Sequence, residues 1–211
     1  MFKIKIICTC ILLSAVSLSC DSLLGIDITK KPQMEKFWKK SMESLPQGAS
    51  VHEINFRSAD QRSKGIMGVA NIIYTNDNEA QLRQIAINLS SWSVLRDGKL
   101  KLSLKETCDG VSSDFMMNYD FGELSDLCRS AIDMLKEHKM KYAGIEYFTV
   151  LFCNEVARYE FVVDGRPEKT PITTKGRYSG VYYHEVYFSA DYDKQLNMDI
   201  RRDLKIKREG I

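Results

Sequence analysis

Apolar and polar positions alternate in a pattern that divides the chain after residue 32 into two similar series of elements. In the first, apolar residues at helical spacing between two prolines predict an amphipathic helix over residues 33–45; they are Met34, Phe37, Trp38, Met42 and Leu45. Strand-like alternation follows over residues 51–58, 66–75 and 82–95, and again from Leu100. Residues 82–95 also fit a helical period, but the hairpin turn expected at Arg96–Lys99 favours a strand.

The second series repeats this order, with a helix before several strands. Asp120 and Glu123 have the spacing of a capping box, and the apolar residues after them share one helical face, which predicts a helix over about 121–139. Strand patterns then cover the ranges 145–153, 156–164 and 180–190 and the chain from Leu196.

Strands that follow one another through short turns form antiparallel sheet, and one helix per sheet covers one face. We therefore predict an α+β fold with two helix-plus-antiparallel-sheet units, residues 33–106 and 119–208, and an internal duplication as a hypothesis. A single continuous sheet that carries two helices would give the same pattern. The two-unit prediction fails if the helices pack against each other and the strands interleave in one sheet.

The N-terminus has a charged start, an apolar run from Ile6 to Ser19, and then Cys20. The 14-residue run is shorter than the roughly 20 residues that a membrane-spanning helix needs, and it has the length of a signal-peptide core. With Ser19 before Cys20, this segment resembles the signal of bacterial lipoproteins, although Ser17 and Leu18 depart from the usual order of types. Ser17 and Ser19 also suit an ordinary signal peptidase, which would release the protein without lipid.

The resemblance implies a signal peptide over residues 1–19, a Cys20 that carries fatty acyl chains such as palmitate, and a tether over residues 20–32. It implies a cell-envelope protein anchored in a membrane by its N-terminal lipid, with its body in the periplasm or on the cell surface. Asp21 favours the inner membrane in many Gram-negative bacteria, but this rule does not hold in all phyla, and a Bacteroidota-like envelope would leave the choice of membrane open.

Removal of residues 1–19 leaves 28 basic and 28 acidic side chains, so the mature chain is formally neutral. Nucleic-acid binding depends on a basic excess and is not expected. A local basic stretch contains Lys30, Lys31, Lys36, Lys39 and Lys40. Contact with anionic lipid is one interpretation of this stretch, but a solvated helix face is the more common one.

Three cysteines remain after the signal peptide and Cys20 are set aside. We predict a disulfide between Cys108 and Cys128, which would close a loop of about 20 residues. Cys153 lies in a strand pattern and is expected to be a small buried apolar residue.

The chain has no common nucleotide-binding or hydrolase motif, and we expect no cofactor. His52 and His184 lie on separate predicted strands without ligand spacing, so no metal site is expected. Aromatic residues are the candidates for contact with a protein partner: Tyr182, Tyr183, Tyr187, Phe37 and Trp38. For each of them, core packing is the alternative.

These features favour a lipid-anchored, non-enzymatic binding or assembly module of the cell envelope, such as an accessory lipoprotein of an envelope-spanning complex. The alternative is a periplasmic or secreted hydrolase whose catalytic carboxylates are brought together only by the fold.

Overall fold

The structure is a computed structural model of the 211-residue chain that describes residues 25–59, 65–76, 79–103, 110–153, 156–167, 173–175, 178–191 and 195–210. Within these ranges, only the backbone is described for residues 79–80, 102–103, 113, 173–175, 178–183 and 201–210. The predicted signal peptide, Cys20 and Cys108 lie outside the described residues.

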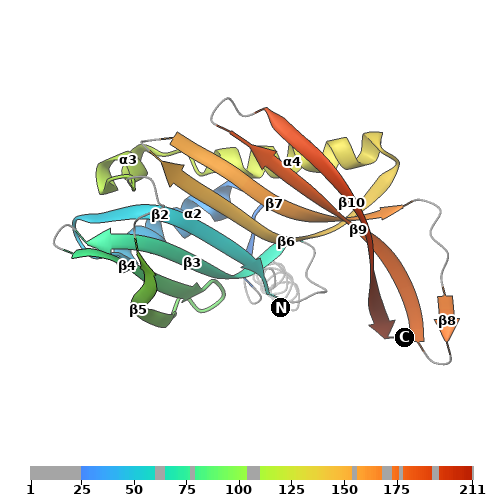
Figure 1. Cartoon of the computed structure of the whole chain (residues 1–211), viewed down its shortest axis with the longest axis horizontal. Helices are drawn as coiled ribbons and strands as arrows, with labels where there is room; N and C mark the ends of the chain where they lie inside the picture. Colours follow the sequence, from blue (N-terminus) through green and yellow to red (C-terminus); the bar gives the residue numbers. More distant parts are fainter. Residues whose placement is uncertain are drawn as a thin grey trace, which may run out of the picture.

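The described strands form one antiparallel sheet with the order β10-β9-β7-β6-β2-β3-β4-β5, while β1 pairs with β3 and β8 pairs with β9 (Figure 1). Their bounds are β1 Ile26–Asp27, β2 Ala49–Ser58, β3 Ile66–Asn76, β4 Glu79–Asn88, β5 Val94–Ser103, β6 Met140–Cys153, β7 Val156–Pro167, β8 Thr173–Lys175, β9 Tyr178–Ala190 and β10 Leu196–Gly210. The described residues also form three helices: α2 Lys31–Ser44, α3 Ser113–Asn118 and α4 Gly122–Glu137.

The α+β prediction is confirmed in its coarse form, but the sheet is continuous, as in the single-sheet alternative. The strands of each predicted half stay together, and β2 and β6 join the halves through an antiparallel ladder. The helices also meet: the Trp38 ring of α2 stacks on Phe121 just before α4, with 4.1 Å between ring centroids. Lys31 Nζ lies 3.1 Å from Asp120 Oδ2 at the same contact. The internal duplication stays a hypothesis.

The ends of the helices follow from local chemistry. Pro32 stands in the first turn of α2, where its missing N–H leaves no intrahelical bond unmade. The Ser112 hydroxyl caps α3 by accepting a hydrogen bond from the Phe115 N–H at 3.3 Å. Ahead of α4, the Asp120 carboxylate accepts from the Gly122 N–H at 2.8 Å. The two predicted helices agree with α2 and α4, whereas the short α3 has too few residues for a periodic pattern.

A row of phenylalanines runs across the helix-covered face of the sheet. Phe56, Phe148, Phe161 and Phe188 are successive cross-strand partners on β2, β6, β7 and β9. The Phe148 and Phe161 rings stack with centroids 4.6 Å apart, and Phe161 stacks on Phe188 at 5.2 Å. All four side chains are buried. The row therefore extends the core from one predicted half of the chain into the other.

Residues 25–32, which the sequence analysis assigned to the tether, belong to the folded body in the structure. Ile26 and Ile28 are buried, and β1 pairs with β3. The Ser125 hydroxyl of α4 donates to the Ile28 carbonyl at 2.9 Å. Alternate apolar residues thus insert this segment between β3 and α4, although the segment is too short for a clear periodic signal.

The predicted turn at Arg96–Lys99 is wrong, since these residues lie inside β5. The chain turns earlier, after Asn88, whose side-chain oxygen accepts hydrogen bonds from the Ser90 and Ser91 N–H groups at 2.9 and 3.0 Å. An asparagine that binds the backbone N–H groups after it builds a turn without glycine. Residues 82–95 therefore hold most of β4, the turn and the first two residues of β5, rather than the one strand predicted.

The predicted disulfide between Cys108 and Cys128 is wrong. Cys128 is a free, fully buried thiol on the core face of α4, and burial raises its pKa well above the ordinary value. The disulfide-bonded cysteine of the described residues is Cys153, which was expected only to pack as a small apolar residue. The loop length along the chain suggested Cys128 as the partner of Cys108. In the structure Cys128 lies on the face of α4 that packs in the core.

We expect Phe148→Ala to lower the free energy of unfolding by about 3–5 kcal/mol, because it leaves a cavity in the middle of the aromatic row. Chemical denaturation measures this loss. Met117→Ala, at a residue whose side chain is 69% exposed on α3, is the control and should change stability by less than about 0.5 kcal/mol. Equal effects of the two changes would contradict the role given to the row.

Candidate functional site

The sheet face that points away from α2 and α4 carries a row of polar side chains. One line of cross-strand partners on this face contains Asn71, Asn55, Thr149, Glu160, Ser189 and Asn197. The Asn55 amide donates to the Thr149 hydroxyl at 2.6 Å across the seam between β2 and β6. The Gln84 amide donates to Asn71 Oδ1 at 2.8 Å. These bonds hold the polar groups in defined positions.

A second line of partners brings two tyrosines to the same face. Tyr147 on β6 and Tyr187 on β9 both pair with Val162 on β7, and Asp199 on β10 pairs with Tyr187. No described helix covers this face, but Val162 is only 1% exposed. The rings of the two tyrosines on either side of Val162 account for its burial. The Tyr187 hydroxyl donates to Glu185 Oε2 at 3.3 Å, which orients its ring.

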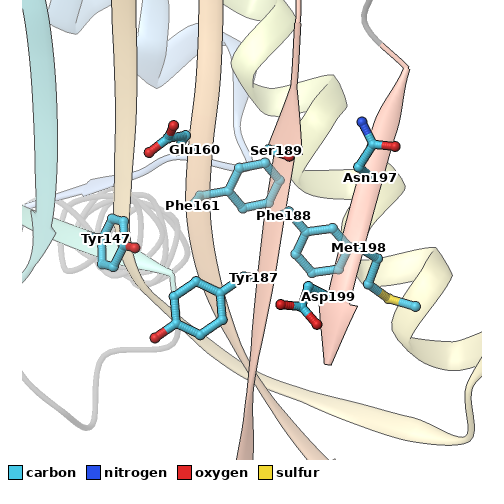
Figure 2. A pocket seen from close by; sticks show the side chains of 9 residues that line it. All are labelled: Tyr147, Glu160, Phe161, Tyr187, Phe188, Ser189, Asn197, Met198 and Asp199. Carbon is cyan, nitrogen blue, oxygen red and sulfur yellow. The ribbon is translucent and has the colours of Figure 1, made fainter. Parts of the chain in front are cut away.

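A cavity of about 320 Å³ lies where these two lines cross β6, β7, β9 and β10 (Figure 2). Tyr147, Tyr187, Glu160 and Asp199 contribute side chains from the open face. The nine lining residues include two carboxylates and no Lys, Arg or His. The floor includes Phe161, Phe188 and Met198, whose strand positions belong to the core face. The cavity therefore combines negative charge with aromatic surface.

More carboxylates lie close to this cavity. Asp164 on β7 and Glu185 on β9 are direct cross-strand partners, and they are only 2% and 8% exposed. Near the seam, burial raises the pKa of Glu53, the negative charge of Glu160 raises it further, and Arg57 opposes this increase. The open face thus gathers carboxylates on neighbouring strands, and Glu53 ionises less readily, mainly because it is partly buried and also because Glu160 is near.

The described ranges hold no group of three or more His, Cys, Asp or Glu residues arranged to bind a metal ion. His52 on β2 and His184 on β9 are separated in the sheet by β6 and β7. Nε2 of His52 lies 3.2 Å from the Thr75 hydroxyl.

Among the residues that the structure describes, no helix has the length and apolar character required to span a bilayer.

The structure separates the predicted aromatic candidates. Phe37 and Trp38 are 0% and 7% exposed in the core between α2, α4 and the sheet, which is the core-packing alternative for these two residues. Tyr187 lines the cavity. The backbone of Tyr182 and Tyr183 lies on β9, paired with Ile206 and Lys205 of β10, while their side chains lie outside the described part.

The sequence analysis missed Tyr147, Glu160 and Asp199. Glu160 and Asp199 are exposed and Tyr147 is half-buried, and each is next in its strand to a residue that lies in the core or packs against it. Alternation within a strand is the signal that assigns them to the open face. The alternation does not show that their three strands are neighbours.

No protein-family model matches the chain, and no curated protein matches it. Among solved structures, the chain is similar to a crystal structure from Clostridium difficile 630 whose protein is named a "putative lipoprotein". The two share 14% sequence identity and a TM-score of 0.39, over 83% of this chain and 90% of the other. A likeness this weak carries no argument about function, so the site is interpreted from its residues alone.

We expect Glu53→Gln to stabilise the protein more at pH 7 than at pH 4. A carboxyl group with a raised pKa in the folded state favours folding only while protonated, and this contribution is lost as pH rises through the folded-state pKa. Glutamine removes the charge and with it this pH dependence. Urea denaturation at both pH values measures the effect, with the exposed Glu43→Gln on α2 as the control. A stabilisation that is equal at the two pH values would contradict the role of Glu53.

Proposed function

We propose that this chain is a lipid-anchored binding protein of the bacterial cell envelope that holds a protein partner on its open sheet face and catalyses no reaction. The observation that carries this proposal is the cavity on β6, β7, β9 and β10, which combines two tyrosines with two carboxylates. Tyrosine gives a large contact area at a low entropy cost, which suits recognition of another protein.

The chemistry of the cavity favours a positively charged group. Carboxylates attract an ammonium or guanidinium group, and the faces of aromatic rings attract the same cations. Glu160 and Asp199 supply the charge, while Tyr147 and Tyr187 supply the rings. A lysine or arginine side chain of the partner is therefore the group we assign to the cavity.

The anchor is supported by the sequence, through the signal-like run before Cys20 and the match to lipoproteins at Ser19 and Cys20. A single acyl chain binds membranes only weakly, whereas the several chains of a processed lipoprotein cysteine hold the protein stably. Gly25 is the first described residue, five positions after Cys20, so the proposed lipid is close in sequence to the sheet.

The intact mass of the mature protein extracted from membranes tests the anchor. We expect a chain that begins at residue 20 with the added mass of its acyl chains, and Cys20→Ala should abolish both the added mass and membrane attachment. Cys128→Ala, at a buried thiol, is the matched control and should leave the added mass unchanged. An unmodified mature chain would show that the ordinary signal peptidase processes it, and the anchor would be withdrawn.

Site-specific photo-crosslinking in living cells of the source bacterium tests the binding face. A photoreactive residue at Ser189, which lines the cavity, should give a discrete crosslinked product, whereas one at Met117 on α3 should not. Glu160→Gln with Asp199→Asn should weaken crosslinking at least about tenfold, because the charges that attract the cation are lost. Equal crosslinking with and without the two carboxylates would contradict the cation-binding role.

The hydrolase is the second candidate, and the buried pair of Asp164 and Glu185 is the observation that favours it. Like charges that share a site are a common feature of acid-base catalysis. Turnover of chromogenic glycosides or esters that is lost in Glu185→Gln and kept in the Glu43→Gln control would favour this candidate over the binding protein.

A further inference from the structure

Apolar side chains are presented to solvent by the turn between β4 and β5 and by the first two residues of β5, and the turn lies beside two lysines of α2. Val94 and Leu95 are 50% and 56% exposed, and Trp92 is half-buried beside them in the chain. Lys40 Nζ lies 5.1 Å from the centroid of the Trp92 ring, and Lys36 Nζ lies 5.9 Å from it. We call these five residues the Trp92 surface.

The turn holds Trp92 in a fixed position. The Trp92 N–H donates to the Asn88 carbonyl at 2.8 Å, and the Asn88 N–H donates to the Ser93 carbonyl at 2.9 Å. Trp92 has a φ of 59°, a left-handed backbone conformation that residues other than glycine rarely adopt. Leu89 is buried and fastens the turn to β3 through its N–H, which donates to the Gly68 carbonyl at 2.8 Å. The turn therefore aims the indole at the lysines at the expense of local strain.

Four of the five lysines of the basic stretch divide into two groups. Lys30 and Lys31 lie within ion-pair distance of Asp27 and Asp120, at 3.5 and 3.1 Å. Lys36 and Lys40 are exposed, and their ring contact is with Trp92. Lys36 and Lys40 therefore place positive charge beside exposed apolar side chains, whereas Lys30 and Lys31 lie beside carboxylates. The sequence pattern did not distinguish the two groups.

The first described residues of the chain lie at the same place. Gly25 and Ile26 line a cavity of about 310 Å³ together with Lys36, Leu89 and Trp92. Gly25 has a φ of 141°, and a Cβ atom there would come within 2.0 Å of the Met67 carbonyl oxygen, so the chain is closely held against β3. Five residue steps join Cys20 to Gly25 and span at most about 18 Å. A lipid on Cys20 therefore keeps this cavity within about 18 Å of the attachment point.

We propose that the Trp92 surface rests on the anionic headgroups of the membrane that holds the lipid anchor. Lysines near an anionic leaflet contribute about fivefold each to binding, while tryptophan and leucine favour the boundary between headgroups and acyl chains. The proposal uses the proposed lipid at Cys20 for its geometry. β5 and β10 are the two ends of the main strand path, so this contact leaves the cavity near β10 accessible to a partner (Figure 1).

Tryptophan fluorescence can read this contact, because the chain has only two tryptophans and Trp38 is stacked in the core. The mature chain with Cys20→Ser is mixed with vesicles of phosphatidylcholine, with or without phosphatidylglycerol, that contain brominated acyl chains. We expect quenching with the anionic vesicles, weaker quenching at high salt, and loss of the quenched component in Trp92→Phe.

Vesicle sedimentation gives the size of the charge contribution. Lys36→Gln with Lys40→Gln should lower the partition coefficient about 25-fold, from about fivefold for each lysine. Leu95→Ser should lower it as well. The matched control, Lys136→Gln with Lys141→Gln, removes the same charge from exposed positions on α4 and β6 and should have little effect. Thermal unfolding of every variant confirms that it is folded.

The same experiments separate this proposal from the anchor. Binding of the unlipidated chain through the Trp92 surface would support the proposal even if the mass of the natural protein shows no acyl chains. A lipidated protein in brominated anionic vesicles whose Trp92 fluorescence is not quenched would overturn it, and the anchor would stand. Equal losses in the two double-lysine variants would also overturn it. Self-association that Leu95→Ser abolishes would assign the surface to a second copy of the chain instead.

Discussion

The pairing of β2 with β6 is the constraint on which the rest of the structure depends. It is the place where strands from the two halves of the chain meet, and each of its faces carries a distinct interaction. On the core side Phe56 faces Phe148, and on the open side Asn55 donates to Thr149 at 2.6 Å. Because side chains alternate between faces, a slip of one residue in this ladder would bury the amide and expose the phenylalanine.

The same register explains how core and site are coupled. The phenylalanine row continues from Phe148 to Phe161 and Phe188, and the last two also contribute to the floor of the cavity. Tyr147 and Glu160 reach the cavity from the opposite side of the same strands. Packing of the rings beneath the sheet therefore fixes the separation of the polar groups above it, and a binding face of this kind needs no flexible loop to form it.

The two functional proposals use different ends of one continuous sheet. The candidate partner site lies on strands toward β10, whereas the proposed membrane contact lies at the turn before β5 and beside the first described residues of the chain. A sheet that is continuous between these ends lets the protein be held at one end and occupied at the other. This arrangement follows from the side-by-side order of the halves, whether or not they arose by duplication.

Periodicity alone predicted the α+β class, the two longer helices and most strands, because burial of one helical stripe or one strand face leaves a direct trace in the order of residue types. The prediction of an N-terminal signal, and of a formally neutral chain after its removal, likewise rests on the sequence. Contacts between distant segments leave no such trace. Tertiary structure alone decided that Phe37 and Trp38 are core residues, that Cys128 is a buried thiol, and that Tyr147, Glu160, Tyr187 and Asp199 share one cavity. It also brought Trp92 beside Lys36 and Lys40, since only the packing of the β4–β5 turn against α2 makes these residues neighbours.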